Sequence, residues 1–114
     1  MVTNAATRSA FEAIADPTRR KILDLVRSRE MRAGDLAARF PVSRPAIARH
    51  VRVLREAGLL RERREATQRY YSLEPKALQA VDEWLAPYRL FWAARLVDLK
   101  RVLEDAEQAV RKKP

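Results

Sequence analysis

The stretch that decides the fold is residues 42–60, which read VSRPAIARHVRVLREAGLL. At about 100° per residue, a helix here gathers its apolar residues on one narrow edge: Ile47, Val51, Leu54 and Gly58. The opposite face carries Pro45, Arg49, Arg52 and Glu56. Ser43 is a favoured N-cap, Pro45 fits the first turn, and Gly58 supplies the left-handed residue that ends many helices. Such a helix suits the major groove of DNA, and a solvated basic helix is the alternative.

The positive charge of the chain is concentrated around this helix. The net charge is +9, and residues 19–69 hold fifteen basic and six acidic side chains, whereas residues 1–18 and 70–114 are nearly neutral. Nineteen of the 24 basic residues are arginine, which suits bidentate recognition of phosphate and guanine. Double-stranded DNA is therefore the expected partner. An anionic membrane surface would also respond to this charge, but the apolar residues are needed for a core, so no membrane association is expected.

Composition excludes several other classes of protein. The 114 residues suffice for one domain with a modest core, and no apolar run or N-terminal pattern predicts a membrane span or a signal peptide, so a cytoplasmic protein is expected. The chain has no cysteine and one histidine, which argues against disulfides, thiolate metal sites and histidine-based catalysis. With Gly34 and Gly58 as its two glycines, it cannot form a glycine-rich phosphate loop. We expect neither an enzyme nor a cofactor.

The segments before and after the arginine helix predict the rest of a small DNA-binding domain. Helices are expected over about 5–15, from Pro17 after the capping Asp16, and over about 33–40, with a short polar break at 28–31. Two helices joined by a short turn over about 33–58 form a helix-turn-helix. Two extended segments then predict a two-stranded β-hairpin, a wing, over about 59–73, although an irregular loop is the alternative.

The C-terminal part predicts helices with an apolar strip. From Val81 the apolar residues follow a near-heptad spacing that Pro87 interrupts, so we expect a short helix from about 75 and a long one from about 82, bent or restarted near Pro87. A small domain cannot cover this strip alone, which favours a homodimer seam over the alternative of an aromatic ligand pocket. The expected seam residues are Trp84, Tyr88, Phe91, Trp92, Leu96 and Leu99.

Several motifs in order resemble one family over about residues 8–100. They are residues 16–23 (DPTRRKIL), 34–37 (GDLA), 43–51 (SRPAIARHV), 54–60 (LREAGLL) and 70–73 (YYSL). With them the chain resembles the ArsR/SmtB family of bacterial winged helix-turn-helix repressors, and residues 83–92 look like its branch without metal-binding residues. The resemblance implies one mainly α (α+β) winged-helix domain over 1–114, with four N-terminal helices, a hairpin wing and a long C-terminal helix. It also implies a homodimer whose interface is formed by the helices over about 5–15 and 75–110, with Phe11 in the first of them. The implied function is repression at a palindromic operator.

The chain departs from the family pattern in informative places. Family sensors carry cysteines in the helix matching 33–40 or histidine and carboxylate ligands on the last helix, and this chain has neither. Asp98, Glu104 and Asp105 alone would make a weak carboxylate site, so neither a bound metal nor a metal response is expected. Ala48 stands where serine is frequent, and Ala66 where a wing glycine is frequent, which leaves the turn geometry open.

The expected DNA contacts follow from the helix face and the wing. Arg49 and Arg52 are the main candidates for base edges, with Arg44, Pro45 and Ala48 close to the bases, while Ser43 and the helix N-terminus suit a phosphate. By resemblance His50 contacts the DNA backbone, and a packing histidine is the alternative. In the wing, four polar residues are expected to reach the minor groove or its phosphates, unless they merely face water: Arg64, Thr67, Gln68 and Arg69.

These features favour a homodimeric, sequence-specific repressor without metal response. A non-specific or architectural nucleic-acid-binding protein explains the charge equally well, and a MarR-type ligand-responsive regulator is a further alternative. The sequence predicts no binding site for a small-molecule effector. It does not identify an effector, the operator or the target genes.

Overall fold

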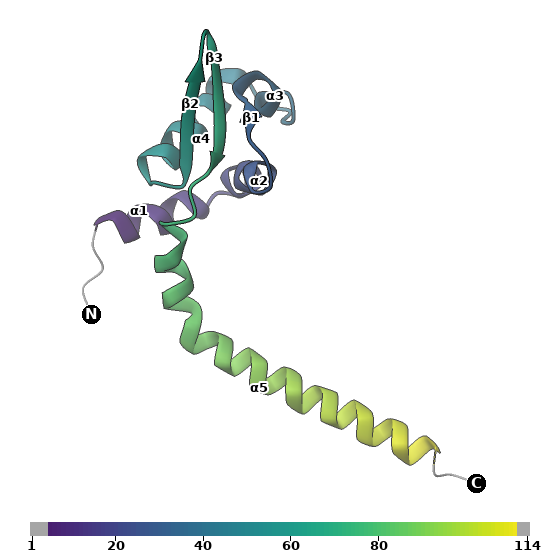
Figure 1. Ribbon diagram of the computed structural model, residues 1–114. Coiled ribbons are helices and arrows are strands. Elements are labelled where there is room, and N and C mark those ends of the chain that lie inside the picture. Colours follow the sequence, from purple (N-terminus) through teal and green to yellow (C-terminus); the bar gives the residue numbers. More distant parts are fainter. Residues whose placement is uncertain (1–4, 112–114) are drawn as a thin grey trace. The chain divides into compact units, whose positions relative to one another are not determined.

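The structure, a computed structural model, describes residues 5–111, along which eight elements follow one another. They are α1 (Ala5–Ile14), α2 (Pro17–Val26), β1 (Met31–Arg32), α3 (Ala33–Ala37), α4 (Arg44–Glu56), β2 (Leu60–Glu65), β3 (Gln68–Leu73) and α5 (Leu78–Arg111) (Figure 1). The chain divides into two compact units between Val81 and Asp82. All elements except α5 lie within the first unit. The predicted winged helix-turn-helix fold is confirmed, whereas the prediction of one domain over 1–114 stays a prediction.

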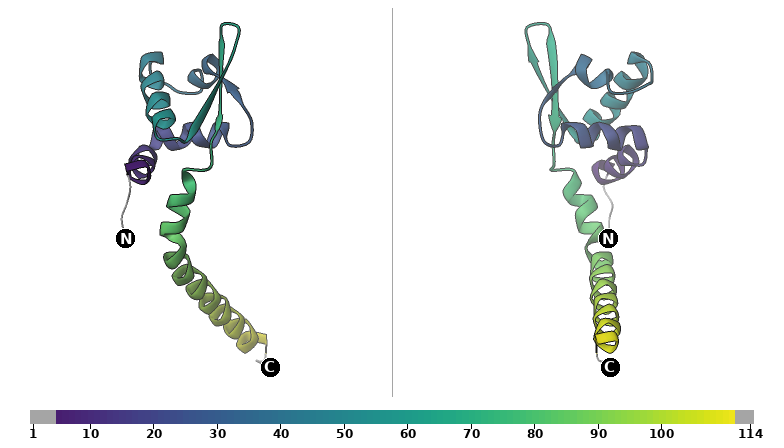
Figure 2. Two further views of the ribbon diagram at one scale, coloured as in Figure 1. Left: turned by 60° about the vertical axis from the view of Figure 1, so that its left-hand side comes forward. Right: turned by 90° about the vertical axis from the view of Figure 1, so that its right-hand side faces the viewer.

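The sheet has three antiparallel strands in the order β1-β3-β2. The predicted hairpin is confirmed, and its register pairs Leu60 with Leu73 and Glu62 with Tyr71; its tip extends past the helices of the first unit (Figure 2). The third strand was not predicted, because Met31, expected in a polar break, pairs with Tyr71 at the other edge of β3. The Met31 side chain is buried in the core while its backbone extends the ladder, so this edge of β3 does not stay open.

The hydrophobic core of the first unit is formed by apolar side chains from one face of each surrounding helix and strand. Ile22, Leu36, Leu54, Leu59 and Val26 are its largest fully buried side chains. The predicted division of α4 is confirmed, since its apolar edge is buried and its opposite face is exposed. This helix packs on α1, α2 and β2, so the arginine-bearing face is fixed by contacts on the other side.

The predicted caps of α2 and α4 are present, whereas α3 ends at Ala37 and not at about residue 40 as predicted. Asp16 accepts a hydrogen bond from the Arg19 backbone N–H at 3.0 Å, and Ser43 accepts one from Ala46 N–H at 3.3 Å. Gly58 has a φ of 77°, and the Leu59 N–H donates to the Leu54 carbonyl at 2.9 Å. This left-handed C-terminal motif turns the chain from α4 directly into β2.

Ala66, in the two-residue turn of the hairpin, adopts a φ of 53°. A Cβ in this region costs about 1–2 kcal/mol, whereas glycine costs about 0.5–1 kcal/mol in chain entropy. We therefore expect Ala66→Gly to raise the free energy of unfolding by about 0.5 kcal/mol, measured by urea denaturation. Thr67→Gly is the control, because the φ of Thr67 is not positive, and it should lower stability. A less stable Ala66→Gly protein would contradict this account of the turn.

The C-terminal segment forms one helix, so the prediction of two is wrong. Pro87 lies inside α5 without ending it. Proline removes one backbone donor and leaves the carbonyl of Glu83 without its partner, and water can reach this exposed position. The residues from Pro75 form a turn in which the Leu78 N–H donates to the Pro75 carbonyl at 3.0 Å. Over residues 5–111, no helix combines the length and apolarity that a membrane span requires.

Candidate nucleic-acid interface

Helix α4 presents three arginines without internal partners. Arg44, Arg49 and Arg52 are exposed, and within residues 5–111 their guanidinium groups have no hydrogen-bond or carboxylate partner. Pro45 and Ala48, also exposed, lie on the same helix. An arginine with five free donors can bind phosphate or the O6 and N7 atoms of guanine. This face therefore has the chemistry predicted for it.

The N-terminus of α4 is already partly satisfied. The Ser43 hydroxyl oxygen accepts from Ala46 N–H, and Pro45 has no N–H to offer. Ser43 is nevertheless exposed, as the predicted phosphate contact requires. The contact itself stays a prediction.

His50 lies in a network that joins α4 to the loop between α1 and α2. Its Nδ1 is 3.3 Å from Arg19 Nη1 and 3.9 Å from Asp16 Oδ2, and its side chain is 25% exposed. Arg19 also donates to the Ala13 carbonyl at 2.6 Å. The backbone N–H of Arg19 lowers the pKa of Asp16 below its ordinary value against the effect of burial, and His50 lowers it further. These contacts favour the packing alternative for His50, and its DNA contact stays a prediction.

The wing presents some of its arginines and uses others structurally. Arg64, Thr67, Gln68 and Arg69 are exposed at or near the turn of the hairpin. Arg63 instead pairs with Glu30 at 2.6 Å and Glu65 at 2.8 Å, and its guanidinium carbon lies 4.3 Å from the centre of the Tyr70 ring. Arg61 pairs with Glu74. These contacts give Arg61 and Arg63 a structural role within the protein.

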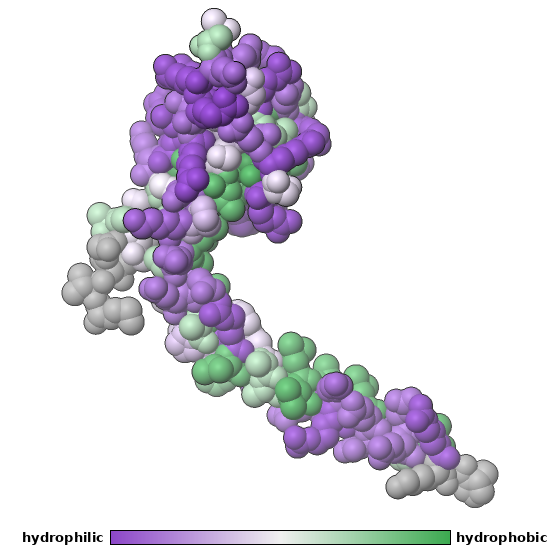
Figure 3. Space-filling view, viewed as in Figure 1, coloured by the Kyte–Doolittle hydropathy of each residue, from purple (hydrophilic) through white to green (hydrophobic). Residues whose placement is uncertain are grey.

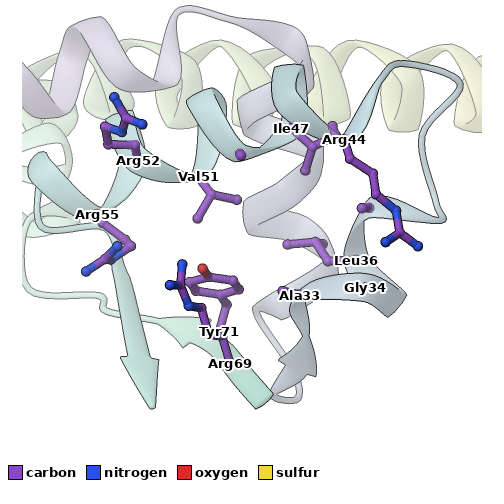
Figure 4. A pocket seen from close by; sticks show the side chains of 12 residues that line it. Ala33, Gly34, Leu36, Arg44, Ile47, Val51, Arg52, Arg55, Arg69 and Tyr71 are labelled. Atoms are coloured by element: carbon purple, nitrogen blue, oxygen red, sulfur yellow. The ribbon is translucent and has the colours of Figure 1, made fainter. Parts of the chain in front are cut away.

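An arginine-rimmed pocket of about 300 Å³ opens between α3, α4 and β3. Its lining combines arginines with apolar side chains (Figure 4), which include Arg44, Arg52, Arg55, Arg69, Leu36, Ile47, Val51 and Tyr71. Because the arginines come from both α4 and the wing strand β3, the two elements share one electropositive surface. Phosphate groups fit this chemistry.

Two residues of this region were not among the predicted site residues. Arg55 of α4 lines the pocket, and its Nη2 is 3.3 Å from Oε2 of Glu62 in β2. Strand alternation could have identified Glu62. It lies two residues after the buried Leu60 in the same strand, so its side chain points to the same, inward face. Arg55 lies one turn after Val51, at the border of the buried edge.

The apolar strip of α5 is exposed. Trp84 is 53% exposed and Leu96 65%, and hydrophobic residues gather along the middle of this helix (Figure 3). The Trp84 and Tyr88 rings contact each other in a tilted arrangement, with centroids 4.9 Å apart and planes inclined by 38°. Phe11, the predicted seam residue of α1, is half-buried. Among residues 5–111, no three His, Cys, Asp or Glu side chains come together as a metal site would require.

Comparison with known proteins identifies the family of the chain that carries this surface. A model described as "Bacterial regulatory protein, arsR family" matches residues 16–62, which run from the cap of α2 into β2. Over 77 residues the chain is 43% identical to the "Transcriptional repressor SdpR" of Bacillus subtilis, covering 68% of this chain and 86% of the relative. The chain belongs to the ArsR family.

Further transcriptional regulators match over greater lengths of the chain. The "HTH-type transcriptional regulator Rv2034" of Mycobacterium tuberculosis is 35% identical over 105 residues, which are 92% of this chain and 95% of that protein. An ArsR-like transcriptional regulator from Rhodococcus sp. RHA1 has a solved structure with a TM-score of 0.65 and 32% identity, covering 86% of this chain and 92% of the other. This ArsR-family chain is a DNA-binding transcriptional regulator, a class distinct from enzymes.

Proposed function

We propose that this ArsR-family protein is a homodimeric repressor that binds a palindromic operator and does not respond to metal. The observation that carries the proposal is the α4 face, where Arg44, Arg49 and Arg52 have no partner within residues 5–111 while the other edge of the helix is held in the core. A rigid helix that offers free guanidinium groups can read base edges. Its charge also supplies the salt-dependent affinity of DNA binding.

The exposed strip of α5 supports the dimer. A contiguous row of large apolar side chains is costly in water, and a two-fold seam with a second copy removes it from water. Phe11 of α1 is the seam residue proposed outside α5. Two copies related by a dyad present two α4 helices, which fit half-sites about 34 Å apart. Occlusion of a promoter by such a dimer is the proposed mode of repression, in keeping with the name of the relative SdpR.

The absence of metal response rests on residue types. No cysteine occurs in the chain, and Asp98, Glu104 and Asp105 do not gather with other ligands into a metal site within residues 5–111. Exposed carboxylates alone bind Zn²⁺ and softer ions weakly. We expect Zn²⁺ to leave the affinity for DNA unchanged.

The test is selection of duplexes from a random-sequence pool, followed by competition. We expect the selected duplex to contain an inverted repeat and to bind at least about a thousandfold more tightly than a shuffled duplex at physiological salt. Equal affinity for the selected and shuffled duplexes would instead establish the non-specific, architectural alternative. A selected site without two-fold symmetry would exclude the palindromic operator.

A further inference from the structure

Glu62 is a carboxylate held between the recognition helix α4 and the wing. It lies in β2 opposite Tyr71 of β3, whose hydroxyl donates to Glu62 Oε1 at 3.0 Å. Arg55 Nη2 lies 3.3 Å and Arg64 Nε 3.5 Å from Glu62 Oε2. One carboxylate therefore contacts an arginine of α4, an arginine of the wing and a tyrosine of the core.

The Glu62 side chain is only 10% exposed, and its charge is retained there by its neighbours. Burial raises the pKa of Glu62, but the Tyr71 hydroxyl and the guanidinium groups of Arg55, Arg64 and Arg69 outweigh this and bring the pKa below its ordinary value. The carboxylate is consequently ionised at neutral pH. Removing one partner of such a group is unfavourable, which keeps the arginines in place.

We propose that Glu62 is a positioning residue for DNA recognition, which fixes Arg55 and Arg64 so that α4 and the wing meet a duplex in one arrangement. The inference rests on the proposed DNA-binding function. Arginine side chains are long and flexible, and a free one binds phosphates wherever they lie, without regard to base sequence. By holding Arg55 and Arg64, Glu62 lowers affinity for DNA in general and raises discrimination between sequences.

The test is Glu62→Gln, which keeps the size of the side chain and an acceptor for Tyr71 but removes the charge. On a random-sequence duplex, we expect tighter binding and a slope of log K against log salt steeper by about 1 to 2, because one or two phosphate contacts are added. The preference of the variant for the duplex selected by the wild type should fall about tenfold, because positioned contacts are lost. A merely structural role for Glu62 would leave the salt slope unchanged.

Glu56→Gln is the matched control. Glu56 is an exposed residue of α4, and within residues 5–111 its side chain has no hydrogen-bond or ion-pair partner. The control makes the same change of charge on the same surface, and its preference should equal that of the wild type. If Glu62→Gln matches Glu56→Gln in both salt slope and preference, Glu62 does not position the arginines and the inference is overturned.

Circular dichroism shows whether each variant folds. If Glu62→Gln does not fold, Tyr71→Phe decides the matter, because it retains the buried ring and removes only the hydroxyl that donates to Glu62. It should shift salt slope and preference in the same direction by a smaller amount, and wild-type values would overturn the inference. A wild type without any preference would contradict the proposed repressor function as well, whereas a discriminating wild type isolates the role of Glu62.

Discussion

Leu96→Glu is expected to convert the proposed homodimer into monomers. Leu96 lies in the middle of the exposed strip of α5, and a two-fold seam would bring two such carboxylates into apolar surroundings without cationic partners. We expect the dimer dissociation constant to rise at least about a hundredfold, which corresponds to about 2.7 kcal/mol. Sedimentation velocity over a concentration series measures this change.

Ala94→Glu is the control for this prediction. At about 100° per residue, position 94 lies on the side of α5 opposite to Trp92 and Leu96, and it is also exposed. It introduces the same charge into the same helix and should leave the dimer intact. Affinity for a two-half-site operator should fall with Leu96→Glu alone, because each monomer then binds its half-site separately. Equal dissociation constants for the two variants would place the seam elsewhere.

Arg49→Ala or Arg52→Ala should each weaken binding to the selected operator by about 1–3 kcal/mol and relax the preference at one position of each half-site. The reason is that their guanidinium groups are exposed on α4 without a partner within residues 5–111, so that base edges supply their hydrogen bonds. Gel-shift titrations at physiological salt with single-base variants of the operator measure both effects.

Arg27→Ala is the matched control, since Arg27 is an exposed arginine at the C-cap of α2 and is not part of α4. It removes the same charge and should leave base preference unchanged. If both α4 variants bind the operator as tightly as the wild type, α4 is not the reading element. Arg69→Ala in the wing should weaken all sequences more evenly and reduce the salt slope by about 1.

The elements predicted correctly are those whose signals are local. Each of these signals occupies a few neighbouring residues. They are the apolar edge and caps of α4, the cap and first-turn proline of α2, and the turn between β2 and β3. The face of α4 follows from its period alone, which is why Arg49 and Arg52 were found exposed as predicted. The wing followed from two extended segments and the C-terminal helix from the near-heptad apolar spacing, and the family motifs implied the same elements.

The features that were missed depend on residues far apart in the chain. Strand β1 has two residues, too few for alternation, and exists because Met31 meets Tyr71. The ion pair of Glu30 with Arg63 joins residues separated by 33 positions, and Arg55 meets Glu62 only through the packing of α4 on β2. At Pro87, a local rule predicted a bend or a restart of the helix, and the restart does not occur because the exposed backbone of α5 does not require it.

The position of the two tryptophans gives the protein a selective optical probe. Trp84 and Trp92 both lie in α5 beyond Val81, and the first unit contains phenylalanine and tyrosine but no tryptophan. Indole fluorescence consequently reports the surroundings of α5, and a blue shift on concentration would mark its removal from solvent. Unfolding of the first unit, which contains α4 and the wing, should leave the tryptophan emission largely unchanged. It has to be followed through tyrosine fluorescence or amide ellipticity.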